Sequence, residues 1–360
     1  MENKWYTDLE EYIKQNEPEK AEKSYIWQTA IGLQDVDNLK TSDYLLETVK
    51  EHIDGNIKLA DVKNRIQNYY LDRSKRKIKE SNTKEADIVS TRIAEILSEK
   101  TFQFSPAEWI SIHRRLFKDV FPHAGIIRKY NISKKEWVLN GESVIYASFN
   151  SIKDSIDYDF NNEKNFSYNT LAIKEFIKHI SKFTSDIWQI HPFEEGNTRA
   201  TAVFIIKYLI NFGFSIANEN FANNSWYFRN ALVRANYNNL PKNIIATTEY
   251  LELFFENLLI NTKHELKNRF LHIDYKKDSK FDKTLENPKC KNCTLDCTLE
   301  EISVLKIILV NNKITQKELA KIINKSERTV KTITVELQNK GYLIRENGKR
   351  NGTWKLLVDL

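Results

Sequence analysis

The residues best suited to chemistry lie in one short segment, His191-Pro192-Phe193-Glu194-Glu195-Gly196-Asn197-Thr198-Arg199. Pro192 disfavours the α conformation at His191, so we predict that a helix ends there and leaves the imidazole at a helix-to-loop corner. A second helix is predicted to begin near Asn197. The Gly196-Asn197 pair at its N-terminus would present free backbone N–H groups and the positive end of the helix dipole, which together favour an anion such as phosphate.

The side chains of this segment suit separate roles in phosphoryl chemistry. His191 is the only group in it that can accept a proton near pH 7, which makes it the candidate general base. Glu195 borders the anion site, where a carboxylate would repel phosphate unless Mg²⁺ lay between them. Arg199, one turn into the helix, can neutralise phosphate oxygens. Phe193 is predicted to be buried and to anchor the loop.

Helical apolar spacing surrounds this segment and predicts a mostly α protein. Between residues 85 and 261 we predict helices at 87–97, 106–117, 172–190, 199–212, 225–237 and 247–260. One stretch, 136–146, departs from the pattern because apolar and aromatic runs flank Asn140-Gly141. That sequence predicts a β-hairpin. A lone hairpin is marginally stable, so we expect it to lie against the helices as a flap.

The chain is predicted to have four parts. Residues 1–84 form a helical module with helices at 43–53 and 59–70, and residues 85–261 form the central helical domain. A polar linker, 262–297, leads to a last unit at 298–360. The last unit is predicted to contain helices at 299–310, 316–323 and 326–339, with Ser326 as an N-cap. Two short strands follow, 342–345 and 353–357, which is the layout of a winged helix-turn-helix.

The chemical segment resembles the Fic family motif, His-x-Phe-x-Asp/Glu-Gly-Asn-Gly-Arg-x-x-Arg. The matching residues are His191, Phe193, Glu195, Gly196, Asn197 and Arg199. Upstream, Ala124-Gly125-x-x-Arg128 and the Asn140-Gly141 turn also agree with the family, in which a flap docks a segment of the target protein. The resemblance covers about residues 85–261.

The resemblance implies a protein adenylyltransferase that moves AMP from Mg·ATP to a Ser, Thr or Tyr hydroxyl of a protein target, or of itself. His191 would deprotonate the hydroxyl, and Glu195 would hold Mg²⁺ between the α- and β-phosphates. Gly196, Asn197, Thr198 and Arg199 would bind the phosphates. The flap, with Asn140, Gly141 and Trp137, would dock the target.

Two positions depart from the family motif. Thr198 replaces the second glycine, and a β-branched residue has little access to positive φ, which predicts a reshaped loop. Ala202 replaces the last arginine, which in the family contacts the γ-phosphate. Arg229 and Arg234 are the candidates to replace it, and the alternative for each is a basic side chain that points to solvent.

The N-terminal module resembles the antitoxin-like segment of many Fic proteins, whose inhibitory signature is Ser/Thr-x-x-x-Glu-Gly/Asn. Within residues 25–32 the glycine is present as Gly32, but Ile31 stands in place of the glutamate and Trp27 in place of the hydroxyl. In the family the glutamate pairs with the last arginine of the motif, which is Ala202 here. We therefore expect inhibition by that charge pair to be absent.

The basic character of the chain is concentrated at its C-terminal end. The net charge is +6, and residues 298–360 carry twelve Lys and Arg against seven Asp and Glu. Arg328, Lys331 and Thr332 are predicted to share one face of the third helix, with Lys349 and Arg350 on the wing. These placements favour binding to DNA. The alternatives are a protein partner or a solvated basic face.

The three cysteines, Cys290, Cys293 and Cys297, are clustered with metal-like spacing. With a fourth ligand such as His272 they would hold a structural Zn²⁺, and the alternative is free thiols in a loop. No disulfide framework is expected, and neither an apolar run of membrane-spanning length nor an export signal is apparent. We expect a soluble, cytoplasmic protein that does not enter membranes.

Three hypotheses remain from the sequence. The first is an AMP transferase, and the second keeps the fold but transfers a phosphate or another nucleotide, as the changes at Thr198 and Ala202 would allow. The third is a DNA-binding regulator whose Fic core senses a nucleotide without turnover. The target protein and the oligomeric state are left open.

Overall fold

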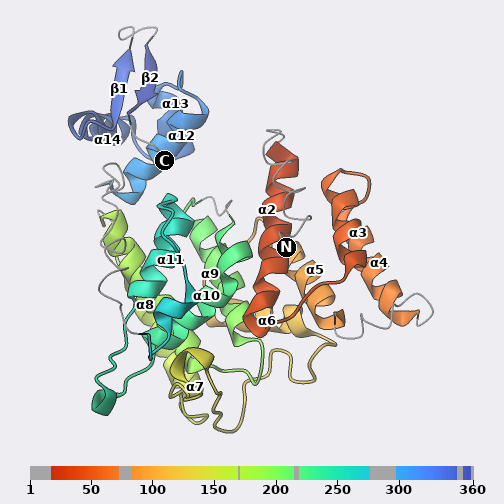
Figure 1. Ribbon diagram of the computed structural model, residues 1–360. Helices are drawn as coiled ribbons and strands as arrows, with labels where there is room; N and C mark the ends of the chain where they lie inside the picture. The colour runs from red at the N-terminus through yellow and green to blue at the C-terminus, as the bar shows by residue number, and fades with distance from the viewer. Residues whose placement is uncertain are drawn as a thin grey trace. The chain divides into compact units, whose positions relative to one another are not determined.

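The computed structural model describes residues 18–72, 83–168, 171–214, 219–275, 297–346 and 352–357. Helices dominate these residues, and the strands among them pair as a two-stranded antiparallel sheet (Figure 1). The predicted mostly α class is therefore confirmed.

The chain divides into two compact units. The first is made of residues 1–165, 181–259 and 264–275, and the second of residues 166–180, 260–263 and 276–360. The N-terminal helices thus belong to the same unit as residues 191–199.

The N-terminal helices pack on one another within the first unit. Helix α2 (Pro18–Gly32) continues into the 3-10 helix η1 (Leu33–Asp37). Helices α3 (Asp43–Ile53) and α4 (Leu59–Leu71) follow as a contacting pair, and both α2 and α4 pack on α5 (Lys84–Ser98) (Figure 1).

A buried carboxylate joins α3, α4 and α5. Asp87 on α5 is fully buried and accepts hydrogen bonds from the backbone N–H of Ser42 at 2.8 Å and from the Tyr70 hydroxyl at 2.7 Å. Ser42 is also the N-cap of α3, because its Oγ accepts from the N–H of Leu45. A buried carboxylate is costly unless it is hydrogen-bonded. These bonds therefore hold the three helices in register.

Helix α2 also packs closely on α10 (Asn220–Ala235). A Cβ at Gly32 would lie 2.4 Å from the Cα of Ala222, so only glycine fits there. Trp27 is fully buried, and its Nε1 donates to Nδ1 of His52 at 3.0 Å. Gly32 and Trp27, two of the three residues that were compared with the inhibitory signature, therefore serve helix packing.

Helix α9 (Asn197–Asn211) is the centre of the first unit. Residues 197–209 are all buried, as expected of a helix that is apolar on most sides. It packs on α5 and on α6 (Pro106–Phe117), a helix that begins at the Ser105 N-cap.

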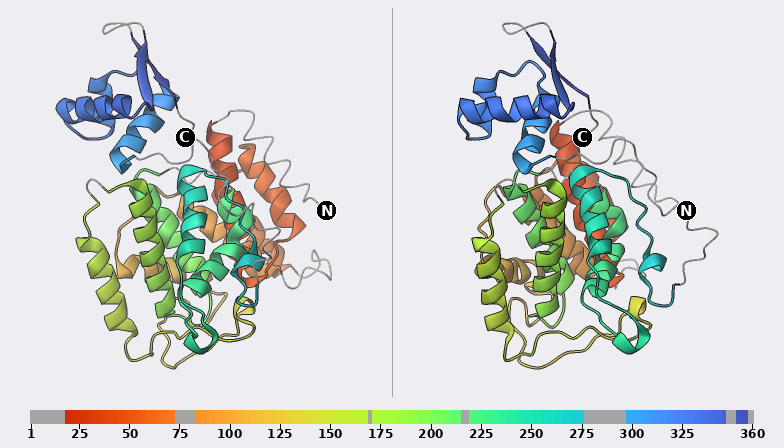
Figure 2. Two further views of the ribbon diagram at one scale, coloured as in Figure 1. Left: turned by 60° about the vertical axis from the view of Figure 1, so that its left-hand side comes forward. Right: turned by 90° about the vertical axis from the view of Figure 1, so that its left-hand side faces the viewer.

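An aromatic cluster fills the core beside α9. Its rings come from the segment before α6, from α7 (Ile152–Asn165), from α8 (Ile173–Ile190) and from α9, and these helices lie next to one another (Figure 2). The rings are those of Phe104, Phe160, Phe183, Phe204 and Tyr208.

The predicted hairpin at residues 136–146 takes a different form, and we call the longer segment around it, residues 131–147, the flap. Every one of its residues is described, yet no strand is assigned in it, and Trp137–Leu139 form the 3-10 helix η4. The turn at Asn140-Gly141 is present, with φ of 56° and 86°. The regular alternation of a strand fails because the adjacent residues Val138 and Leu139 are both buried.

The second unit contains the predicted winged helix-turn-helix. Its elements are α12 (Leu299–Val310), α13 (Gln316–Ile322), α14 (Glu327–Asn339), β1 (Leu343–Glu346) and β2 (Thr353–Leu356). The strands are antiparallel, with Ile344 opposite Lys355. Lys349 and Arg350, predicted on the wing, lie outside the described residues.

Hydroxyl side chains start the three helices α12, α13 and α14. Thr298, Thr315 and Ser326 each accept a hydrogen bond from the backbone N–H three residues further on. Such N-caps satisfy donors that the helix leaves unpaired. The predicted N-cap at Ser326 is confirmed.

The described residues bear on two further predictions, the absence of a membrane-spanning segment and the zinc site. In the described ranges, no helix is long and apolar enough to cross a membrane. The same ranges hold no group of three His, Cys, Asp or Glu side chains that could bind a metal ion. Cys297 is buried, whereas Cys290 and Cys293 lie outside the described residues. The zinc site stays a prediction.

Candidate active site

Residues 191–199, here the motif loop, connect α8 to α9. Helix α8 ends at Ile190, and His191 has a left-handed φ of 49°, outside the α region that Pro192 disfavours. Gly196, with a φ of 79°, directly precedes α9. The predicted helix end and helix start are both confirmed.

Gly196 could not be another residue without strain. Its positive φ favours glycine, and a Cβ would lie 2.4 Å from the ring of Phe117. The backbone of the motif loop therefore lies directly against α6.

The side chain of Asn197 closes the motif loop on itself. Its Oδ1 accepts from the backbone N–H of Phe193 at 3.0 Å, and its Nδ2 donates to the carbonyl of Phe193 at 2.7 Å. Phe193 is fully buried, as predicted, and stacks on the His113 ring with the centroids 3.6 Å apart. Asn197 thus shapes the loop through its side chain and keeps its backbone N–H available.

The first turn of α9 presents backbone donors to an anion. In the part of the chain that the structure describes, the N–H groups of Gly196, Asn197 and Thr198 have no hydrogen-bond acceptor. Together with the helix dipole, such groups attract phosphate. Thr198 is helical, and its Oγ1 accepts from Nε1 of Trp188 at 2.9 Å. Thr198 therefore needs no positive φ in this structure.

The imidazole of His191 is buried, but one of its nitrogens, Nε2, is available to accept a proton. Only 3% of the residue is exposed, and its ring lies 4.1 Å from that of Tyr146. Nδ1 is 3.3 Å from the carbonyl of Trp188, so this nitrogen carries the proton, and no hydrogen bond to Nε2 is found among the described residues. Burial, followed by the charge of Lys134, lowers the pKa of His191 well below its ordinary value. The neutral ring can therefore accept a proton at Nε2.

Arg128 holds the backbone around His191. Its Nε donates to the His191 carbonyl at 2.8 Å, and its Nη2 donates to the carbonyl of Ala147 at 2.6 Å. The backbone N–H of Arg128 also donates to the carbonyl of Pro192 at 2.9 Å. The Arg128 side chain is thus a structural link between the flap and the motif loop.

His113 on α6 is a supporting residue that sequence reasoning missed. Its Nδ1 accepts from the backbone N–H of Gly125 at 2.9 Å, so its Nε2 carries the proton and donates to the carbonyl of Glu195 at 2.9 Å. The signal in the sequence was a histidine at an interior position of an otherwise apolar helix face. His113 therefore fixes the backbone of the candidate metal ligand.

We expect His113 to make the protein less stable in acid. Burial lowers the pKa of His113 to about 3, whereas the unfolded chain takes up the proton near pH 6.5. The free energy of unfolding should therefore fall as the pH drops from 6.5 towards 3, by up to about 1.4 kcal/mol per pH unit. Urea unfolding at several pH values measures this slope. A His113→Gln variant should show a shallower slope, and an equal slope would contradict the assignment.

Glu195 has a cationic partner that the sequence did not reveal. Its carboxylate is 56% exposed, and Oε2 lies 2.8 Å from Nζ of Lys134 on the flap. The neighbouring Glu194 lies 3.2 Å from Nδ1 of His123. A carboxylate at a helix N-terminus that already attracts a cation is a suitable place for a Mg²⁺ ion beside phosphate.

Arg199 is placed differently from the phosphate contact that the motif suggests. Its guanidinium is 2% exposed and pairs with Asp37 at 2.8 Å and with Glu85 at 2.6 Å. It also donates to Oε1 of Gln34 at 3.1 Å and lies over the Phe117 ring. Asp37 of the N-terminal module therefore forms a charge pair with the motif loop. The arginine of this pair is Arg199, whereas the last arginine of the family motif would stand at Ala202. We call Gln34, Asp37, Glu85 and Arg199 the arginine cluster.

The two candidate replacements for the missing arginine differ in environment. Arg229 pairs with the buried Glu136 of the flap at 3.0 Å, and Tyr146 donates to the same carboxylate at 3.3 Å. Arg234 is 9% exposed, and its Nε and Nη1 are buried without an acceptor among the described residues. Neither arginine points freely to solvent.

The flap residues expected to meet a target are partly engaged. Trp137 is 49% exposed and contacts the His272 ring edge-on. Nδ2 of Asn140 donates to Asp274 at 3.0 Å, and the carbonyl of Val138 accepts from the N–H of Ile273. Residues 272–274 therefore line one side of the flap.

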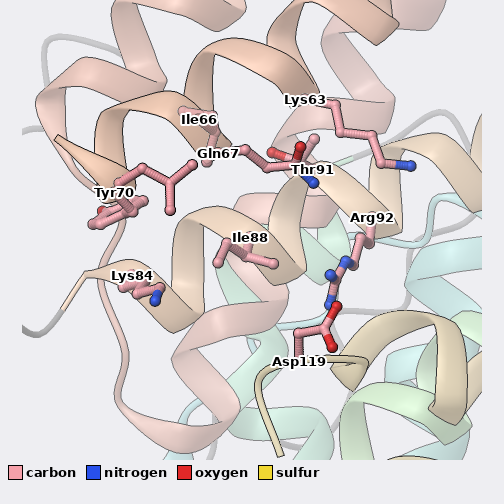
Figure 3. Close-up of a pocket in the computed structure, with 10 residues that line it drawn as sticks. Lys63, Ile66, Gln67, Tyr70, Lys84, Ile88, Thr91, Arg92 and Asp119 are labelled. Atoms are coloured by element: carbon pink, nitrogen blue, oxygen red, sulfur yellow. The ribbon is translucent and has the colours of Figure 1, made fainter.

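A cavity of about 280 Å³ lies away from the motif loop, between α4, α5 and Asp119 (Figure 3). Apolar side chains such as Ile66 and Ile88 line it together with Lys63 and Arg92. No residue of the motif loop borders this cavity, so it is not the candidate active site.

Comparison with known proteins agrees with this geometry. Residues 103–209 match the model of the Fic/DOC family, and residues 301–344 match a model described as winged helix-turn-helix DNA-binding. The chain therefore carries a Fic/DOC domain followed by a winged helix-turn-helix domain.

Individual relatives are distant. The probable protein adenylyltransferase Fic of Salmonella typhimurium (strain LT2) is 22% identical over 116 residues, which is 32% of this chain and 55% of that protein. The chain thus spans about half the length of this curated relative. A Fic family protein from Desulfovibrio desulfuricans G20 is similar at 12% identity with a TM-score of 0.44, covering 98% of this chain and 94% of that one.

Proposed function

We propose that the protein transfers AMP from ATP to a Ser, Thr or Tyr hydroxyl of a protein target. Nε2 of His191 takes the hydroxyl proton while the hydroxyl oxygen forms a bond to the α-phosphorus. The bond between the α-phosphorus and the bridging oxygen breaks, and pyrophosphate leaves with that oxygen. Donors at the N-terminus of α9 stabilise the charge that develops on the phosphate oxygens.

The observation that carries this proposal is the arrangement of the motif loop. A neutral imidazole with a free Nε2 and a helix start with unpaired N–H groups lie at opposite ends of the same short loop. Positioning and charge stabilisation are the main catalytic contributions in such a transfer. The relative named as a probable adenylyltransferase supports AMP as the transferred group.

The residues present fit a Mg²⁺ ion, with Glu195 as its protein ligand. Glu195 directly precedes Gly196, the N-cap of α9, and its exposed carboxylate already pairs with a cation. When bound, Mg²⁺ would neutralise charge on the phosphates.

Exposed apolar side chains around the flap favour a protein target. Tyr130, Trp137 and Ile145 are 50%, 49% and 84% exposed. Large apolar and aromatic side chains of this kind are common anchors in protein interfaces. We therefore propose that the target, or a second copy of this chain, docks on the flap.

Intact mass after incubation with Mg·ATP tests the proposal. A gain of one AMP, on this chain or on a target, is the expected result. ATP labelled at the α or the γ position separates the alternatives, because label carried only from the γ position means phosphate transfer. If no mass gain occurs with any target while nucleotide still alters a regulatory effect, the third hypothesis, a nucleotide-sensing regulator, replaces both enzymes.

We also propose that α14 binds DNA. Arg328, Lys331 and Thr332 are exposed on one face, while Val330 and Leu337 are buried on the other. This places two cations and a hydroxyl where a recognition helix contacts bases and phosphates. Replacing Arg328 and Lys331 with alanine should weaken DNA binding and make it less dependent on salt, as fluorescence anisotropy would measure. Unchanged binding would exclude this face.

A further inference from the structure

Lys134 contacts the motif loop from the flap. Its ammonium is 2.8 Å from the Glu195 carboxylate, and the two side chains are 22% and 56% exposed. The backbone N–H of Lys134 donates to Oγ of Ser143 at 3.1 Å, which fixes the base of the side chain. An ion pair this exposed contributes little to stability. A stronger ligand can therefore separate the two side chains.

Three arginines of the motif loop or in contact with it or the flap are engaged with protein acceptors instead. Arg128 donates to backbone carbonyls, Arg199 pairs with two carboxylates, and Arg229 pairs with a buried one. These side chains are 15% exposed or less. A phosphate could recruit any of them only by leaving a carboxylate or carbonyl in the core without its donor.

The charge of Lys134 also reaches His191. After burial, this ammonium is the largest influence that lowers the pKa of His191. Lys134 therefore lies near both the candidate general base and the candidate metal ligand. A nucleotide whose α-phosphate faces His191 and whose metal is held by Glu195 would extend its other phosphates past this lysine.

The geometry points to Lys134 as the residue that binds the β- and γ-phosphates of the nucleotide, moving from Glu195 to the phosphates when Mg·ATP enters. Glu195 then has a cationic partner in both states, the lysine without nucleotide and the metal with it. A flexible ammonium is well suited to such an exchange because it binds as a point charge without a fixed donor plane. This inference rests on the proposed function and names a determinant of its nucleotide specificity.

The experiment measures nucleotide affinity without turnover. The full-length His191→Asn variant is the parent, because asparagine tolerates a positive φ and lacks the basic nitrogen. Lys134→Met, Lys134→Arg and Lys135→Met are added to it separately. Lys135 is the matched control, since it is the next residue, exposed, and equally charged. Isothermal titration with ATP, ADP and AMP, each with Mg²⁺, gives the dissociation constants.

We expect Lys134→Met to weaken ATP and ADP binding by about tenfold or more, the usual effect of losing a charged hydrogen bond. AMP binding should be unchanged because AMP lacks the other phosphates. Lys134→Arg should retain most of the ATP affinity, and Lys135→Met all of it. Equal ATP affinities for Lys134→Met and Lys135→Met would overturn the inference, as would tighter ATP binding or an equal loss for AMP.

Failure of this inference can be told apart from failure of the proposed function. If the His191→Asn parent binds no ATP, and the unsubstituted chain gains no AMP, the proposed function and this inference fail together. If AMP transfer is observed but Lys134→Met binds ATP normally, only the role of Lys134 is excluded.

Discussion

Replacing His191 with asparagine is expected to lower the rate of AMP transfer by about 10²- to 10⁴-fold, the usual contribution of a general base. ATP binding should persist, because the donors of the α9 N-terminus are backbone groups. Asparagine is preferred to alanine because position 191 has a φ of 49°, which asparagine adopts more readily. Initial rates of incorporation from α-labelled ATP measure the effect, and thermal unfolding of the variant checks its fold.

The pH dependence of the transfer rate of the unsubstituted chain tests the role of His191 independently. Because the pKa of His191 is lowered by burial and by Lys134, the imidazole stays neutral as the pH falls below 6.5. The acid limb of the rate profile should therefore lie well below pH 6.5. A rate that halves near pH 6.5, or an asparagine variant that is fully active, would remove His191 from the role of base.

Replacing Arg199 with methionine is expected to lower the free energy of unfolding by about 3 kcal/mol. The substitution keeps a similar volume but leaves Asp37 and Glu85 without their cation. These two carboxylates are 30% and 28% exposed, so water would compensate for part of the loss. Urea unfolding at neutral pH measures the change.

A double-mutant cycle with Asp37→Asn separates the ion pair from other effects of the substitution. If the arginine cluster stabilises the fold, the coupling free energy between Arg199→Met and Asp37→Asn should be about 1 kcal/mol or more. An Arg199→Met variant of unchanged stability that no longer binds ATP would instead make Arg199 the phosphate ligand suggested by the motif.

Local signals in the sequence predicted much of the fold. Helices 43–53, 106–117 and 299–310 have the predicted bounds, and each begins at a hydroxyl N-cap. The motif loop was predictable for the same reason, because proline and glycine fix its conformation locally. Helices α2 and α7 were not predicted, since their apolar stripes are narrow and much of each sequence is polar.

The parts of the candidate site that were not predicted depend on contacts between residues distant in sequence. Lys134 and Glu195 are 61 positions apart, and Gln34 and Arg199 are 165 apart. Nothing in the local sequence around Lys134 marks it as a partner of the motif loop. Glu136 of the flap likewise pairs with a residue distant in sequence, Arg229 on α10.

The arginine cluster has a consequence for how such chains can diverge. Its four side chains come from η1, α5 and α9, and Arg199 contacts each of the other three. Loss of a partner deprives the buried guanidinium of an acceptor, and loss of Arg199 deprives two carboxylates of their cation, so we expect substitutions to be inherited together. Exchanging the N-terminal helices between related proteins should then succeed only when the arginine at position 199 is exchanged with them.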